Sequence, residues 1–173
     1  RTVCEPRLGP DILAADPPIR AVWVTAGNPV AMLPDSNAVY KALATRELLV
    51  VADSFLTDTA RLAHVVLPTP TLLEADDLLG AYGHHWIGVA RPVVPPPPGV
   101  RSDVEIVSAL AARVGLGEHF TATARAWKER LLAPALKASG VTLETLEAGA
   151  VRNPLAPSVL WPDRRFPTES GRV

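Results

Sequence analysis

The stretch Leu48-Leu-Val-Val-Ala-Asp53 is a continuous apolar run that ends at a carboxylate. Two similar runs flank it in the chain: 20–26, Arg-Ala-Val-Trp-Val-Thr-Ala, which stops at Gly27-Asn28-Pro29, and 64–67, His-Val-Val-Leu, which stops at Pro68. Short continuous apolar runs that end at turn signals are typical of strands buried in a parallel sheet. The sequence therefore predicts strands here, with 20–26 covered on both faces and Val66 buried in the sheet.

Helical patterns separate these runs. Ser36 is a candidate N-cap for a helix to about Thr45, and a short helix is expected between residue 57 or 58 and Ala63. Alternation of strand and helix predicts the α/β class, with a parallel sheet, right-handed crossovers and flanking helices. Loops beyond the carboxyl ends of such strands are where ligands bind.

The rest of the chain is less regular. Prolines predict an irregular segment over 1–19, in which residues 11–15 could form one helical turn. Residues 69–101 are expected to be loop-like, with a strand possible near 86–90. Ser102 and Glu105 form a capping-box pattern that opens a helix to about Val114. Further helices are expected over 121–139 and 142–148, followed by an extended tail. The expected domains are 1–19, 20–150 and 151–173.

Composition excludes several classes of protein. The chain has 173 residues, and its 17 basic and 18 acidic residues give a net charge of −1, which argues against binding to nucleic acid or to an anionic membrane surface. The single cysteine, Cys4, excludes an internal disulfide and a Cys-rich zinc or iron–sulfur site in this chain. Every apolar run is too short to span a membrane.

The candidate site consists of polar residues at strand ends. Asp53 could accept two N–H bonds from a ligand such as a guanine base, and Asn28 offers both a donor and an acceptor. Thr57 and Thr59 could place hydroxyl groups at a helix N-terminus. The alternative is structural: Asp53, Thr57 and Asp58 would only cap a helix. His64 is expected to be a packed histidine.

Several motifs follow one another in a fixed order along the chain. They are Gly27-Asn28-Pro29, Asp53-Ser-Phe-Leu-Thr57-Asp-Thr59-Ala, Ala63-His64-Val-Val-Leu-Pro68, Glu74, Gly80-Ala-Tyr-Gly-His84, Pro98-Gly-Val-Arg-Ser-Asp103 and Phe166-Pro-Thr-Glu-Ser-Gly-Arg172. In this order they resemble the molybdopterin oxidoreductase family, which includes dimethyl sulfoxide reductase and formate dehydrogenase. The resemblance runs from about Pro18 to Gly115 and returns in the tail.

The resemblance implies a Rossmann-like domain over 20–150 that holds molybdopterin guanine dinucleotide. In the bis form of this cofactor, two such dinucleotides hold one molybdenum or tungsten atom. The implied cofactor-binding residues are Asn28, Ala52, Asp53, Thr57 and Asp103, with Ala52 lending its backbone; no catalytic residue and no metal ligand is expected. His64 departs from the family pattern, which has Asp at this position.

The family also implies a larger parent enzyme. We expect this chain to be a fragment, not catalytic alone, whose partners are the remaining domains of the parent and a small-molecule redox substrate in electron transfer. An iron–sulfur cluster is possible in the parent but not in this chain. The compartment stays open, with the cytoplasm favoured over the periplasm. Two alternatives remain: a stand-alone α/β nucleotide-binding or protein-interaction module without redox activity, and a different nucleotide-using enzyme such as a thiamine-enzyme central domain.

Overall fold

A computed structural model describes residues 2–172. The chain divides into two compact units, and each is described by itself. Unit 1 comprises Arg1–Ala75 and Pro92–Thr121, and unit 2 comprises Asp76–Arg91 and Ala122–Val173. The residues predicted to form one domain, 20–150, are therefore distributed over both units.

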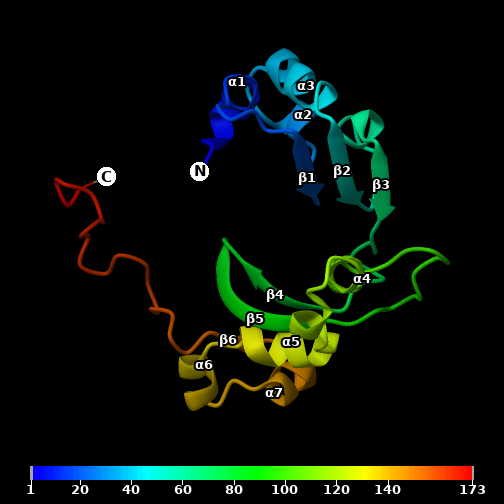
Figure 1. Cartoon of the computed structure of the whole chain (residues 1–173). Helices are drawn as coiled ribbons and strands as arrows, with labels where there is room; N and C mark the ends of the chain where they lie inside the picture. Colours follow the sequence, from blue (N-terminus) through cyan, green and yellow to red (C-terminus); the bar gives the residue numbers. More distant parts are fainter. Residues whose placement is uncertain (1, 173) are drawn as a thin grey trace. The chain divides into compact units, whose positions relative to one another are not determined.

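Unit 1 is built on a parallel sheet of three strands in the order β1-β2-β3. The strands are β1 (Ala21–Thr25), β2 (Leu48–Asp53) and β3 (Val65–Pro68), and their arrowheads point the same way in Figure 1. Thr25 lies opposite Ala52 and Asp53 lies opposite Pro68, so the three strands end at one edge. The predicted α/β class is confirmed, because helices flank this parallel sheet.

The helices of unit 1 follow the predicted alternation in most places. The N-cap of the helix between β1 and β2 is Asp35, whose side chain accepts from the Ala38 backbone N–H, and not Ser36 as predicted. The helical elements are η1 (Glu5–Arg7), α1 (Leu8–Leu13), α2 (Pro29–Met32), α3 (Ser36–Ala44), η2 (Ala60–Leu62), α4 (Asp103–Arg113) and η3 (Gly117–Phe120), where η marks a 3-10 helix.

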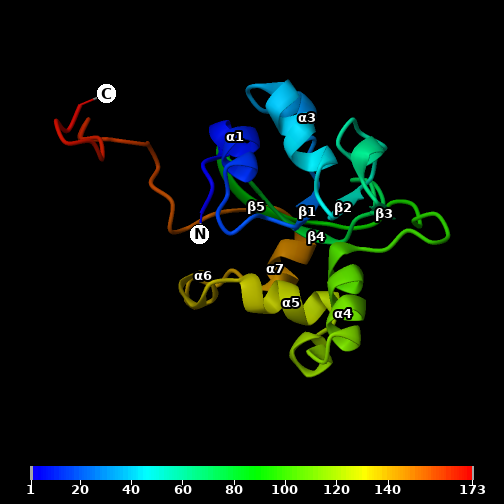
Figure 2. The ribbon, with the colours of Figure 1, turned by 45° about the horizontal axis from the view of Figure 1, so that its top comes forward.

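The core of unit 1 lies between α1, α3 and β2, and Figure 2 shows both helices on the same side of the sheet. A Cβ built on Gly9 would lie 2.5 Å from the Val39 backbone nitrogen, so α1 approaches α3 closely only because residue 9 is glycine. The prediction of an irregular segment over 1–19 is therefore wrong for η1 and for the first part of α1, which begins before the single helical turn expected over 11–15. Pro10 is tolerated because it lies in the first turn of α1, where its missing N–H has no helical partner to lose. The buried residues are Ile12, Val39, Ala42, Leu43, Leu49, Val51 and Ala60.

Burial differs sharply between the three strands. Leu49, Val50, Val51 and Ala52 of β2 are all buried. In contrast, Trp23 of β1 is 41% exposed and Val66 of β3 is 38% exposed. The predictions that 20–26 is covered on both faces and that Val66 is buried are thus wrong for this structure, because β1 and β3 are the edges of a three-stranded sheet.

His64 joins β2 to the start of β3. Its ring Nδ1 accepts a hydrogen bond from the Leu49 backbone N–H at 3.0 Å, and its own backbone N–H donates to the Leu49 carbonyl at 2.9 Å. The side chain is exposed rather than packed, so the prediction of a packed histidine is wrong. The His64 ring instead satisfies the backbone N–H of Leu49, a fully buried residue.

The hydrogen bond between Leu49 and His64 predicts how substitutions of His64 change the stability of unit 1. His64→Ala leaves the Leu49 N–H without a partner and should destabilise unit 1 by about 1–3 kcal/mol. His64→Asn should retain most of the stability, because Oδ1 of asparagine, like Nδ1 of histidine, is bonded to Cγ. Urea unfolding of the two variants measures the difference. Equal stability of the alanine and asparagine variants would show that this hydrogen bond does not stabilise unit 1.

Unit 2 combines an antiparallel sheet with three helices. The strands are β4 (Asp77–Ala81), β5 (His84–Ala90) and β6 (Val151–Arg152), and the helices are α5 (Ala124–Leu131), α6 (Pro134–Ala138) and α7 (Leu143–Ala148). Strand β5 confirms the strand expected near 86–90, and its pairing with β4 replaces another part of the predicted loop 69–101. The helix predicted over 121–139 is two helices, since Pro134 begins α6 instead of continuing α5.

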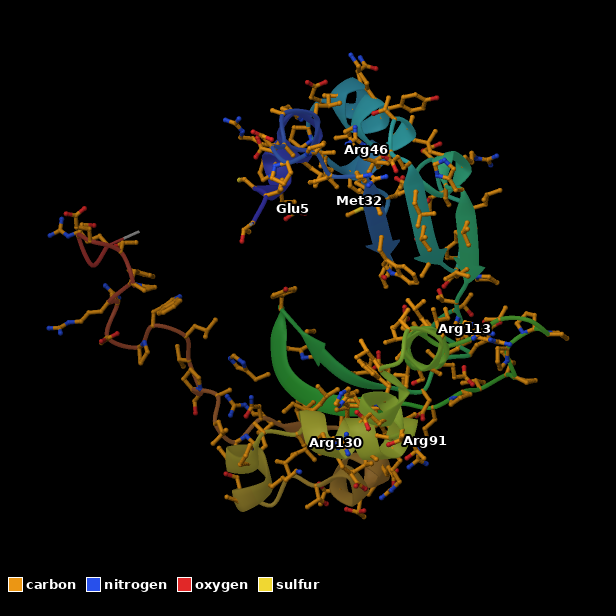
Figure 3. All side chains as sticks on the ribbon, in the orientation of Figure 1. Glu5, Met32, Arg46, Arg91, Arg113 and Arg130 are labelled. Atoms are coloured by element: carbon orange, nitrogen blue, oxygen red, sulfur yellow. The ribbon has the colours of Figure 1, made fainter. Side chains whose placement is uncertain are left out.

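Polar contacts reinforce the packing of unit 2. The Lys128 ammonium donates to the Asp76 carboxylate at 2.5 Å, which ties α5 to the start of the hairpin. Arg125 pairs with carboxylates of α5 and α7, and Arg91, labelled in Figure 3, donates to the Glu147 carbonyl at 2.6 Å. The buried core below the sheet consists of Leu132, Val141, Leu143 and Leu146.

Candidate functional site

Polar residues follow the carboxyl ends of the strands in unit 1. Asn28 follows β1 and precedes α2, and Asp53 is the last residue of β2. The chain returns to the end of β3 at Arg101, whose backbone N–H donates to the Pro68 carbonyl at 3.2 Å. Asp103 comes two residues later, at the first position of α4. All five predicted site residues therefore belong to unit 1. Asn28 follows β1, Asp53 ends β2, Thr57 follows β2, and Ala52 is the next-to-last residue of β2.

Asp53 is half-buried, and only one of its carboxylate oxygens is used by the fold. Oδ1 accepts a hydrogen bond from the Phe55 backbone N–H at 2.9 Å, which closes an Asx turn after β2. The Asp53 carbonyl accepts from the Thr69 N–H at 3.3 Å and so links the ends of β2 and β3. Within residues 2–172, Oδ2 accepts no hydrogen bond. Asp53 thus combines a structural role with one acceptor that remains for a ligand.

Ala52 contributes only its backbone. The residue is 1% exposed, and its carbonyl accepts a hydrogen bond from the Ala26 N–H at 2.9 Å. This bond extends the pairing of β1 and β2 by one residue beyond the strand. Ala52 therefore holds the start of the loop that carries Asn28 against the end of β2.

Asn28 is held by Thr59. The Asn28 Oδ1 accepts from the Thr59 backbone N–H at 3.1 Å and from the Thr59 hydroxyl at 2.8 Å. Thr59 is fully buried, and its Oγ1 also accepts from the Val30 backbone N–H at 3.1 Å. Sequence reasoning included Thr59 only as a hydroxyl near a helix N-terminus. Its contact with Asn28 spans 31 positions, so no local pattern could have revealed it.

Thr57 and Asp103 have different surroundings. The Thr57 Oγ1 accepts from the Ala60 N–H at 3.1 Å, so this hydroxyl stabilises the turn that leads into η2, whose N-cap is Thr59. The Asp103 side chain is exposed beside the Ser102 cap. Hydrogen bonds from the Ser102 backbone N–H and hydroxyl lower the pKa of Glu105, so Glu105 stays ionised and completes the predicted capping box.

Among residues 2–172, no group of three or more His, Cys, Asp or Glu side chains could hold a metal ion. In the same part of the chain, no helix is long and apolar enough to cross a membrane. Unit 1 is thus an α/β unit with polar atoms at the carboxyl edge of a parallel sheet, where proteins of this class bind ligands.

Comparison with known proteins agrees with this class. Residues 10–113 match the family model described as molybdopterin oxidoreductase. The chain is 39% identical over 163 residues to "Probable oxidoreductase YyaE" of Bacillus subtilis, which covers 93% of this chain and 24% of the relative. It is 38% identical over 110 residues to the dimethyl sulfoxide/trimethylamine N-oxide reductase of Cereibacter sphaeroides, which covers 62% of this chain and 13% of the relative.

A solved structure is similar over nearly the whole chain. Acetylene hydratase from Pelobacter acetylenicus matches with a TM-score of 0.69 and 26% identity, covering 99% of this chain and 24% of that protein. The chain belongs to the molybdopterin oxidoreductase family. Membership implies a molybdenum–pterin cofactor. The chain spans a quarter or less of the length of these three relatives.

Proposed function

We propose that unit 1 holds the guanine dinucleotide part of a molybdopterin cofactor at the carboxyl edge of its parallel sheet. The observation that carries this proposal is the second carboxylate oxygen of Asp53, which lies at the end of a buried strand and accepts no hydrogen bond within residues 2–172. A carboxylate accepts hydrogen bonds only, and the Watson–Crick edge of guanine presents adjacent N–H donors. Asp53 is therefore matched to guanine.

The other predicted residues fit neighbouring parts of the same ligand. Asn28 can donate a hydrogen bond from its side-chain amide nitrogen. Ala52 holds the loop of Asn28 against β2 through its backbone carbonyl, and Asp103 lies two residues after Arg101, which is hydrogen-bonded to the end of β3. Thr57 shapes the loop between Asp53 and η2 by accepting a hydrogen bond from the Ala60 backbone N–H. In this arrangement the chain binds and orients the dinucleotide, and the bound cofactor supplies the redox chemistry.

We further propose that the parent protein is a molybdenum- or tungsten-dependent oxidoreductase. Its remaining domains would hold the metal, a second dinucleotide of the bis form and the small-molecule redox substrate. Any iron–sulfur cluster would be ligated outside this chain, which has only Cys4. The chain spans only a small share of each relative, which supports the assignment of these functions to other parts of the parent protein.

The proposal is tested on the complete polypeptide that contains this chain, produced in a host that makes the cofactor. Acid hydrolysis should release GMP from the purified protein, and elemental analysis should find molybdenum or tungsten in proportion to the GMP. A protein that carries neither GMP nor metal under these conditions would overturn the proposal. That result would favour a binding or interaction module without redox activity.

A further inference from the structure

We propose that Thr59 is a positioning residue that fixes the orientation of the Asn28 side-chain amide, so that Asn28 presents only N–H donors to a non-protonated oxygen of the dinucleotide. This inference rests on the proposed function. It adds a residue that does not itself contact the ligand, and it assigns a definite hydrogen-bonding polarity to a residue that could otherwise accept or donate.

The polarity follows from two backbone donors. A backbone N–H can only donate, so the Thr59 N–H, 3.1 Å from the Asn28 side chain, requires an oxygen and not an NH₂ group opposite it. The Val30 N–H likewise donates to the Thr59 Oγ1 at 3.1 Å. The hydroxyl therefore has its proton available for the Asn28 Oδ1, which lies 2.8 Å away. In both hydrogen bonds Thr59 is therefore the donor and the Asn28 Oδ1 is the acceptor.

The remaining polar atoms of Asn28 are also used within the fold. Its carbonyl accepts from the Ala31 and Met32 backbone N–H groups at 3.0 Å and 2.9 Å. Its backbone N–H points at the Sδ of Met32, labelled in Figure 3, at 3.4 Å. Only Nδ2 makes no hydrogen bond to another residue of the described chain. Asn28 therefore has two side-chain N–H donors and no acceptor left for a ligand.

Burial makes this orientation costly to reverse. Thr59 is 0% exposed, so water cannot replace Asn28 as the partner of its N–H and hydroxyl groups. Turning the amide by 180° would place NH₂ against the Thr59 N–H and leave that buried donor unsatisfied. The fold thus pre-organises a donor in the loop after β1, and the free acceptor of Asp53 ends the neighbouring strand β2. A ligand must present an oxygen to the Asn28 side-chain N–H groups and N–H groups to the Asp53 carboxylate.

The decisive test compares two substitutions of Asn28 in the complete polypeptide. Asn28→Asp keeps an oxygen opposite Thr59 but replaces the donor by a charged acceptor that faces the ligand oxygen. Asn28→Ala removes the donor without adding a charge. We expect the cofactor to dissociate about 2- to 10-fold faster from the alanine variant than from the wild type, and faster still from the aspartate variant. The measurement is the GMP retained over time after rapid filtration.

Thr59 is tested through its effect on Asn28. Thr59→Val removes the hydroxyl at nearly constant volume and should speed dissociation, whereas Thr59→Ser keeps the hydroxyl and should restore slow dissociation. In the Asn28→Ala background, Thr59→Val should cause no further increase, because Thr59 acts only through Asn28. A purely structural role would instead give the same increase in both backgrounds, and this result would overturn the inference.

The outcomes separate this inference from the proposed function. Slow dissociation from the Asn28→Asp variant, equal to or slower than from Asn28→Ala, would show that the polarity is wrong. If Asp53→Asn still speeds dissociation in that case, the dinucleotide site itself stands. If neither Asp53→Asn nor the Asn28 variants change retention, the dinucleotide lies elsewhere, and both the proposed function and the inference fail.

Discussion

Val51→Asp should unfold unit 1. Val51 is 0% exposed on the central strand β2, on the face that packs against α1 and α3. The core around it is apolar, so an aspartate there would be a buried charge without a partner. Substitutions of this kind cost about 4 kcal/mol or more, a large part of the 5–15 kcal/mol by which domains are stable. We expect loss of soluble protein and of the cooperative thermal transition.

Val66 provides a matched control for Val51. The two residues lie directly opposite each other in the register of β2 and β3, but Val66 is 38% exposed on an edge strand. Val66→Asp should therefore cost only about 1 kcal/mol, the range of strand preference between residues. Circular dichroism melting curves of the two variants give the comparison. A soluble Val51 variant with a normal transition would contradict the placement of the core.

The second large effect is expected at Asp53. Asp53→Asn should keep the fold, because the asparagine Oδ1 can still accept from the Phe55 N–H in the Asx turn. It replaces the ligand-facing oxygen by an NH₂ group, which opposes the N–H donors of guanine. Each hydrogen bond to a charged acceptor contributes about 1.5–3 kcal/mol, so affinity for the cofactor should fall by roughly 10- to 100-fold or more.

The measurement for Asp53 is the GMP and metal content of the purified complete polypeptide, together with its melting temperature. Asp58→Asn is the matched control, since it makes the same chemical change on an exposed residue of the following loop. We expect the control to keep full cofactor content and to melt like the wild type. The Asp53 variant should still unfold cooperatively, at a melting temperature lowered only by the loss of bound cofactor. Unchanged GMP and metal content in the Asp53 variant would remove Asp53 from the site.

Local sequence was sufficient for much of unit 1. The apolar run 48–53 predicted β2, and the capping box of Ser102 and Glu105 predicted the start of α4, because both patterns depend on residues close in the chain. The ordered strand-end motifs also led to the family. Strand β4 was missed because its sequence, Asp-Leu-Leu-Gly-Ala, has neither β-branched residues nor a clear alternation.

The sequence by itself determined the α/β class of unit 1, the family and the positions of polar residues after the strands. The tertiary structure decided which strand is buried, since exposure depends on neighbours that only the sheet order supplies. It also decided the hydrogen bonds at Asn28, whose partner Thr59 lies 31 positions away. The physical reason is that strand and cap signals come from residues in local contact, whereas burial and the direction of a side-chain amide are set by groups that meet only after folding.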